Sequence, residues 1–505
     1  MRTDFRDAMH RLHTGVGVTL GGLLLVIFWM GTLSVFDREI DRWMMPETRL
    51  SAPHATLSSF DNTVLPHVQH LAAPGTSWRV SLASARTPFH TLRYTDADGA
   101  SVRRHIDPLR GELLDGPHTA GASGFFFPFH FSLHLGTAGY WIAGLAGMAM
   151  LVLIVSGVLI HRRLLADFFT FRPSRALPRA SLDAHNLTGV IALPFHFMIT
   201  LSGLVIFFAI YFPATWHGAY AETAAHPQQT FNLEAFGSWS RPAAHESAGN
   251  VASVDAMIAE ARRLWGGPPA DQVRGWHAGD AAGYIAVRRS FANEVRRNVD
   301  VVFFDAANGE RLYRHTASTV VKVQRFLAGL HFLQFDHWPL RWLYFAAGLA
   351  GCVMIGSGLL FWLAARRRQS RANRAGLHVV TAIAVTTTSG LMNATLAFLV
   401  ANKVLPVTLD GRAGTEMQVF FIAWAVMFAH ALWRGARAWR EQCALVAGLA
   451  IGAATLNWGM TGQHPIAALQ SDMPAIAGVD LMLLALGFSA AAVTRRLSRN
   501  GAADG

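Results

Sequence analysis

The sequence has few charged residues and almost no cysteine. Of its 505 residues only 15% are Asp, Glu, Lys or Arg, whereas an ordinary soluble domain has about 25%. The two cysteines, Cys352 and Cys443, both lie in apolar stretches, so they can form neither a disulfide framework nor a cysteine metal site. This composition, 52% hydrophobic, excludes a disordered chain and a simple cytosolic enzyme, and it predicts several membrane spans plus some soluble mass.

Several sequence motifs of enzymes are also missing. Neither a GxGxxG nor a GxxxxGK[ST] phosphate loop occurs, so no built-in domain for NADPH, flavin or ATP is visible. No HExxH lies on an apolar stretch, which argues against a membrane zinc protease. If the protein is a redox protein, its electrons must therefore come from a separate donor, either a membrane quinol or a cytoplasmic reductase.

Eight apolar stretches have about the 20 residues that a helix needs to cross a bilayer. They lie near 14–36, 137–160, 187–211, 341–363, 377–401, 416–433, 443–461 and 474–494. The first is too long for a signal peptide and is interpreted as an anchor. The expected divisions are 1–36 (tail and first span), 37–136 (outer module), 137–211 (second and third spans), 212–340 (outer module), 341–368 (fourth span) and 369–505 (a four-span extension).

Arginine indicates the orientation of these spans. The basic clusters are Arg2, Arg6 and Arg11; Arg162, Arg163, Arg172, Arg175 and Arg179; Arg366, Arg367, Arg368, Arg371 and Arg374; Arg434, Arg437 and Arg440; and Arg495, Arg496 and Arg499. All of them fall on one side if both termini are cytoplasmic, as the positive-inside rule requires. The net charge of +11 is then mainly topological, and we expect a multi-pass protein of a bacterial inner membrane with lipid, not nucleic acid, as its partner.

The first four spans contain a duplication. His13 precedes Gly17 by four residues and Gly31 by eighteen, and His185 precedes Gly189 and Gly203 by the same spacings. Spans two and four each carry Gly-Leu-Ala-Gly, then Ser-Gly, then an arginine cluster. For each of these two spans a histidine stands 27 residues before the glycine of Ser-Gly. His130 precedes Gly157, and His331 precedes Gly358. Such self-similarity predicts two copies of one structural unit.

The two outer segments also resemble each other. Asp107 to Gly111 matches Asp305 to Gly309, each after an apparent strand, 101–106 and 298–304. A helix over 254–265 and a strand over 284–289 precede the second turn. The expected fold is therefore a polytopic α-helical membrane protein of about eight helices, with an internal duplication and two small α+β modules outside the membrane. Arginines of the second module could attract an anionic chelate or could be solvated strand edges: Arg288, Arg289, Arg296 and Arg297.

Histidines at both ends of the duplicated spans predict two stacked b-type haems. A haem iron accepts two axial imidazoles, which facing helices of a bundle can supply. His13 with His185 would hold an inner haem, and His130 with His331 an outer one. The alternative is that each histidine is an interfacial residue solvated by lipid headgroups. Ionisable groups inside spans are nevertheless expensive and usually functional.

Other histidines could replace these ligands. His134, one helical turn after His130, could substitute for it. His161 could replace His13 or His185, although Trp362 stands at its equivalent position in the repeat. His196 fits either a hydrogen-bonded core residue or part of a proton or electron path, and we expect Asp480 to be a snorkelling carboxylate.

Five segments of the chain resemble a known family. They are Leu12-His13 through Asp37–Asp41, Phe129–His134, Ser156–His161 through Phe168–Pro173, Asp183–Asn186 through Leu193–His196, and Arg341–Tyr344. Over about 1–368 the sequence resembles the PepSY-associated transmembrane helix family of bacterial inner-membrane proteins. The resemblance implies PepSY-like outer modules and the activity of some members, which carry b haems and reduce siderophore-bound Fe(III). The extension from 377 onward departs from the minimal four-helix members.

The predicted function is transmembrane electron transfer through two b haems to a periplasmic acceptor, above all a ferric siderophore. The protein would then be a haem-dependent oxidoreductase of the ferric-chelate reductase type. Two alternatives remain. One is a cofactor-free, membrane-anchored sensing or protease-modulating protein, and the other is a transporter that uses His196 and Asp480 as a proton relay.

Overall fold

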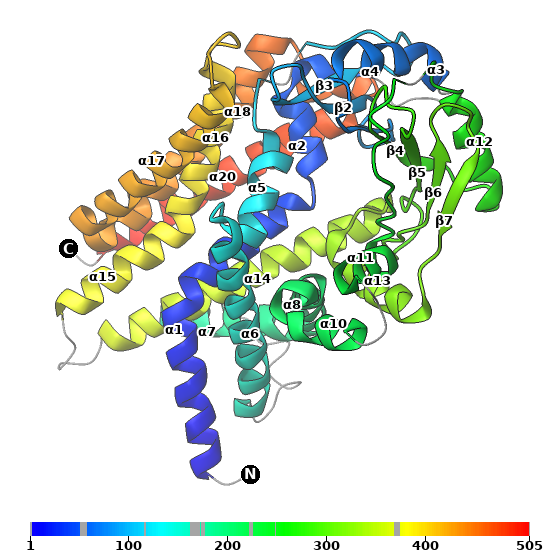
Figure 1. The fold of residues 1–505 in the computed structure, drawn as a ribbon. Coiled ribbons are helices and arrows are strands. Elements are labelled where there is room, and N and C mark those ends of the chain that lie inside the picture. Colours follow the sequence, from blue (N-terminus) through cyan, green and yellow to red (C-terminus); the bar gives the residue numbers. More distant parts are fainter. Residues whose placement is uncertain are drawn as a thin grey trace. The chain divides into compact units, whose positions relative to one another are not determined.

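The computed structural model describes residues 3–50, 58–115, 118–161, 172, 177–221, 226–247, 249–367 and 374–503 (Figure 1). The chain forms two compact units. One comprises Met1–Met44, His118–Leu204 and Trp338–Gly505, and the other comprises Met45–Pro117 and Val205–His337. Six arginines that indicate the orientation lie outside the described residues: Arg2, Arg162, Arg163, Arg175, Arg368 and Arg371.

Long apolar helices dominate the first unit. Its amino-terminal part consists of α1 (Thr3–Ser34), α2 (Asp37–Met44), α5 (Gly121–Ser132), α6 (Gly136–Ile160), α7 (Leu177–Ile191), α8 (Leu193–Ile206) and α14 (Trp338–Arg367). Within the described residues, six helical stretches are long and apolar enough to cross a membrane, or seven when the bent pair α7–α8 counts as one span. The chain is therefore a multi-pass membrane protein.

The third expected span is a broken one. Helices α7 and α8 meet at an angle of 67°, with Ala192 between them. Pro194 stands at the second position of α8, where its missing N–H costs no helical hydrogen bond but prevents α7 from continuing straight. Hydropathy did not predict this break, because the apolar stretch 187–211 runs through Ala192 without interruption.

The carboxyl-terminal extension is fully helical. It contains α15 (Arg374–Val385), a π-helical turn η2 (Thr386–Gly390), α16 (Leu391–Val404), α17 (Arg412–Arg434), α18 (Ala438–Thr461), α19 (Pro465–Gln470) and α20 (Pro474–Ala503). The stretch Arg412–Thr461 counts once among the six or seven candidate spans. Sequence analysis expected two spans there, and α17 and α18 are indeed separated by a short turn at Gly435, whose φ is +55°.

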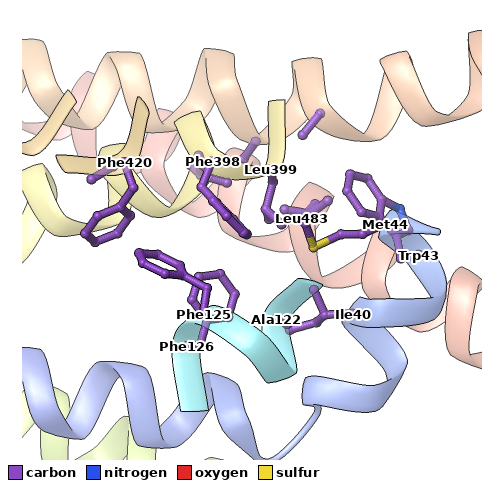
Figure 2. Packing of buried hydrophobic residues seen from close by; sticks show 14 of the residues in the cluster. Ile40, Trp43, Met44, Ala122, Phe125, Phe126, Phe398, Leu399, Phe420 and Leu483 are labelled. Atoms are coloured by element: carbon purple, nitrogen blue, oxygen red, sulfur yellow. The ribbon is translucent and has the colours of Figure 1, made fainter. Parts of the chain in front are cut away.

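The extension shares a hydrophobic core with the amino-terminal helices, so it is not a loosely attached appendage. Figure 2 shows Phe125 of α5 and Trp43 of α2 facing Phe398, Phe420 and other apolar residues of the extension. The Phe125 ring lies 4.8 Å from that of Phe398 and 4.9 Å from that of Phe420. Burying large aromatic side chains contributes about 1.5–3 kcal/mol each, which ties the extension to α2 and α5.

The second unit contains one antiparallel sheet of seven strands. Its strands are β1 (Trp78–Ser81), β2 (His90–Thr95), β3 (Ser101–Ile106), β4 (Ala270–Trp276), β5 (Tyr284–Arg289), β6 (Val301–Asp305) and β7 (Arg311–His315), in the order β3-β2-β1-β4-β5-β6-β7. The expectation of two separate modules is corrected here. Strand β1 of the first outer segment pairs with β4 of the second, because joining the two edges satisfies their free backbone groups.

Helices α3 (Phe60–Thr63), α4 (Leu65–Leu71) and α12 (Val254–Leu264) cover one face of this sheet (Figure 1). The carboxylate of Asp255 accepts hydrogen bonds from the N–H groups of Phe60 and Asp61 at 2.9 and 3.1 Å. The carboxylate of Asp61 in turn accepts from Val254 N at 2.8 Å. Each outer segment thus caps a helix of the other, which is the contact expected of two duplicated halves in one body.

The two matched turns of the outer segments have the same conformation. Asp107 Oδ1 accepts from the N–H groups of Leu109 and Arg110, and Asp305 Oδ1 accepts from those of residues 307 and 308. Gly111 and Gly309 follow with φ of +70° and +75°, which only glycine adopts without strain. Short helices complete the unit: α9 (Phe208–Tyr211), α10 (Pro213–Tyr220), α11 (Pro227–Phe236) and α13 (Thr319–Phe332).

Candidate cofactor site

His13 lies on α1 and its imidazole contacts α6. The Nδ1 atom is 3.1 Å from the carbonyl oxygen of Leu153 and 3.1 Å from Ser156 Oγ. Gly157 permits this approach, because a Cβ atom built there would lie 3.2 Å from Cε1 of the ring. The glycine of the Ser-Gly motif is therefore a contact surface for the imidazole.

His185 makes the same contact in the second copy of the repeat. It lies on α7, and its Nδ1 is 2.7 Å from the carbonyl oxygen of Met354 on α14. A Cβ at Gly358 would lie 2.9 Å from that nitrogen. The carbonyl partner stands four residues before the glycine, as Leu153 does before Gly157, so the duplication extends to the atoms that hold each ring.

The two imidazoles lie close to each other. The ring centroids of His13 and His185 are 6.2 Å apart and the ring planes cross at 79°. Each Nδ1 faces a backbone carbonyl and must donate to it, which assigns the lone pair to Nε2. A metal–imidazole bond is about 2 Å long and the ring centroid lies roughly 1 Å beyond the nitrogen, so two axial imidazoles on one iron have centroids roughly 6 Å apart. The centroid separation of His13 and His185 matches that value.

His130 repeats the pattern on α5. Its Nδ1 is 2.8 Å from the carbonyl oxygen of Ile27 on α1, and a Cβ at Gly31 would lie 2.7 Å from the same nitrogen. Here too the carbonyl stands four residues before the glycine. His331 lies in the last turn of α13, in the second unit, and its pairing with His130 stays a prediction.

His134 does not continue the helix face of His130, as its spacing suggested. Helix α5 ends at Ser132, and Leu133 and His134 have φ of +51° and +54°. His134 Nε2 is 3.0 Å from the carbonyl oxygen of Phe125, and its ring stacks on the Phe125 ring at 5.1 Å. That contact occupies the nitrogen that the other histidines leave available. His161 directly follows the end of α6 and is half-buried.

His196 interrupts the symmetry of the repeat, because its equivalent position is the buried Leu24. It lies on α8 with 1% of its surface exposed. Its Nε2 is 3.2 Å from the carbonyl oxygen of Ala347, and a Cβ at Gly351 would lie 3.1 Å from that nitrogen. Among the described residues, its Nδ1 has no hydrogen-bond partner. Here the bonded nitrogen is Nε2, the reverse of His13, His130 and His185.

Asp480 does not snorkel to a membrane surface, so this expectation is wrong. Its side chain is fully buried and accepts hydrogen bonds from the indole N–H groups of Trp43 and Trp458 at 2.7 and 2.8 Å. Asn457 donates a third at 3.2 Å. Lys403 lies nearby, with Nζ 3.9 Å from the centre of the Trp43 ring. Position along the chain suggested an interfacial residue, whereas packing of α2 against α18 and α20 buries it.

An apolar cavity of about 470 Å³ lies between α1 and the extension. Its walls include Gly22 of α1, Phe129 of α5, Leu359 of α14, Thr387 of η2 and Trp424 of α17. Phe129 directly precedes His130, and Leu359 directly follows Gly358. The cavity is thus lined by sequence neighbours of His130 and Gly358 but not by the histidines themselves, and its size falls in the range of small-molecule sites.

A chain of hydrogen bonds links η2, whose Thr387 lines this cavity, to a partly exposed ion pair. Ser389 of η2 donates to Gln442 Oε1 at 3.0 Å, and Gln442 Nε2 is 3.4 Å from His430 Nδ1. His430 Nε2 is 3.1 Å from Glu441 Oε2, which also pairs with Arg434. π-helical turns often occur at functional sites. The sequence did not reveal this row of hydrogen bonds, because the residues that form it lie on three different helices.

Comparison with known proteins shows the family of the chain. A family model described as the PepSY-associated TM region matches residues 10–365. The chain belongs to this family. The uncharacterized protein PA4219 of Pseudomonas aeruginosa is 28% identical to it over 374 residues, which cover 69% of this chain and 90% of that protein. Four of the helices that hold the histidine contacts, α1, α5, α6 and α7, lie wholly or almost wholly inside the family region, and so does nearly all of α14.

Proposed function

We propose that this PepSY-associated membrane protein holds b-type haem between its histidines and transfers electrons across the inner membrane to a ferric chelate. One observation supports the proposal above all others. His13, His130 and His185 each direct Nδ1 to a helix carbonyl four residues before a close-packed glycine. Each thereby offers Nε2 as a ligand in a fixed orientation.

The residues of the chain have distinct roles in this proposal. His13 and His185 would supply the axial nitrogens of an inner haem, and His130 with His331 those of an outer haem. The carbonyl groups of Leu153 and Met354 fix the tautomer and raise the basicity of their imidazoles. When bound, the haem iron supplies one-electron redox chemistry, whose potential depends on ligands, burial and hydrogen bonds.

We further propose that the electron donor is a membrane quinol bound in the apolar cavity beside α1. Phe129 and Leu359, which adjoin His130 and Gly358 in the sequence, line the cavity, and the sequence carries no nucleotide-binding loop for a soluble donor. Oxidation of one quinol releases two electrons and two protons, and the two electrons reduce two ferric ions to ferrous ions. The two protons are released to water.

The absorption spectrum of the detergent-purified chain, before and after reduction by dithionite, tests the proposal. We expect a sharp reduced α band and about two b haems per chain by the pyridine haemochrome method. His13→Ala and His185→Ala should each lower the haem content, whereas His10→Ala, an exposed histidine one turn away on α1, should not. A colourless protein after expression with ample haem would refute the proposal and favour an anchored sensing module or a transporter.

A further inference from the structure

The outer sheet carries a row of four arginines at directly paired positions. Arg103 of β3 pairs with Arg93 of β2, Arg93 pairs with Arg79 of β1, and Arg79 pairs with Arg274 of β4. Directly paired residues of antiparallel strands project from the same face, with Cβ atoms about 5 Å apart. The four guanidinium groups therefore form one ladder across four neighbouring strands, which we call the arginine ladder.

The ladder lies on the face of the sheet opposite its helices. Trp78, Val80 and Leu92 alternate with the ladder residues along β1 and β2 and belong to the core that packs on α3, α4 and α12. The arginines therefore project away from that core. Arg93 is exposed and the other three ladder residues are partly exposed.

Three of the four ladder strands contain no acidic residue. Strands β1, β2 and β3 contain no Asp or Glu, and in the described part of the chain neither Arg79 nor Arg93 forms an ion pair. Burial, followed by the charges of Arg274, Arg288 and Arg93, lowers the pKa of Arg79. Like charges in direct opposition destabilise a sheet, so the directly paired Arg79 and Arg93 cost the fold stability unless a ligand compensates their charge.

The arginines that sequence analysis named for an anionic chelate behave differently. Arg288 forms a two-point ion pair with Asp271, and Arg289 pairs with Asp300 and Glu294. Arg296 lies 3.4 Å from Glu294. These side chains are engaged within the unit, whereas Arg79 and Arg93 form no ion pair among the described residues.

Aromatic rings continue the ladder at its β4 end. The guanidinium group of Arg274 lies 4.3 Å from the centre of the Trp276 ring, two residues further on the same face. Trp276 stacks on Tyr284 at 4.8 Å with an interplanar angle of 12°. Arginine and aromatic rings together suit a ligand that is both anionic and aromatic, because guanidinium binds oxyanions and both groups stack on flat rings.

We propose that the arginine ladder binds a ferric chelate with net negative charge and aromatic donor groups, such as a tris-catecholate complex. This inference rests on the proposed function, because it names the class of acceptor to be reduced. Three catecholates give Fe(III) a net charge of −3, whereas three hydroxamates leave the complex neutral. The ladder predicts that the protein discriminates between the two classes by charge.

Gallium complexes separate binding from reduction, because Ga(III) copies the charge of Fe(III) but is not reduced. Isothermal titration calorimetry of the full detergent-purified chain would compare gallium tris(catecholate), whose charge is −3, with neutral gallium tris(acetohydroxamate). We expect the first to bind at least tenfold more tightly, with an affinity that falls as salt concentration rises. A failure here leaves the haem spectrum unaffected, so it is distinguishable from a failure of the proposed function.

Variants locate the binding site. Arg79→Gln and Arg93→Gln should each weaken binding of the anionic complex about tenfold. Arg79→Lys keeps the charge and should lose less, and it shows whether a loss comes from charge or from misfolding. Arg263→Gln on α12 removes an exposed arginine outside the ladder and should bind like the wild type. Any one of three results would overturn the inference. They are equal affinity for both gallium complexes, equal losses of affinity in the ladder and control variants, and equally tight binding of inorganic phosphate.

Discussion

The substitution Gly358→Ala tests whether the close glycine contacts position a ligand. A Cβ atom at this position would lie 2.9 Å from Nδ1 and 3.1 Å from Cε1 of His185. Real Cβ contacts are almost never that short, so the imidazole must move by several tenths of an ångström. The hydrogen bond of Nδ1 to the Met354 carbonyl, 2.7 Å long, is then stretched or lost.

The expected magnitudes separate stability from ligand geometry. Losing one neutral hydrogen bond costs about 1 kcal/mol of the free energy of unfolding. Replacing a glycine inside a helix by alanine stabilises it by about 1 kcal/mol. Because these terms oppose each other, we expect little change in the melting temperature. Changes to groups that orient a ligand typically lower metal affinity about 10–100-fold, so haem occupancy should fall.

The assay is the haem content per chain together with the reduced spectrum. Gly356→Ala on the same helix is a matched control, because its Cβ would meet only Thr388 Cγ2 at an ordinary 3.7 Å. The control should keep the wild-type spectrum. If Gly358→Ala also keeps the wild-type haem content and band positions, His185 is not a ligand held by this contact and the reasoning is refuted.

Three further predictions follow from single sites. His134→Ala should keep the wild-type haem spectrum, because its Nε2 already contacts a carbonyl; a loss of haem would make His134 a ligand. Asp480→Ala should lower the free energy of unfolding by about 3 kcal/mol or more, since it orphans the buried donors Trp43 and Asn457, and an unchanged melting temperature would contradict this. Burial lowers the pKa of His90 to about 4 and that of His105 to about 3, below the roughly 6.5 of an unfolded chain. Stability should therefore fall as pH drops from about 6.5 towards 4, and His105→Gln should flatten that dependence in thermal melts; an equal slope in the variant would contradict it.

Local patterns in the sequence determined much of the architecture. Strands β3 and β5 begin and end at the expected residues, and α12 differs from the expected helix by one residue. These elements are predictable because alternation and helical periodicity depend on neighbours along the chain. The repeated histidines and Ser-Gly motifs are visible in the sequence, but their spacings did not show which meet: His13 contacts Gly157 and His185 contacts Gly358.

Only the tertiary structure decided how these elements combine. The two outer segments form a single sheet because β1 pairs with β4, and strand register depends on partners far apart in sequence. The break after His130 and the bend at Ala192 lie within apolar runs where hydropathy cannot detect them.

The chemistry of the candidate sites likewise depends on distant partners. The carbonyl groups that hold His13 and His185 belong to the backbone, so no residue type at Leu153 or Met354 reveals them. Asp480 became a buried acceptor only through packing of three helices, and the arginine ladder exists only once four strands align. Sequence determined which groups are present and which elements carry them. Folding decided which groups meet, because long-range packing sets helix approach and strand register.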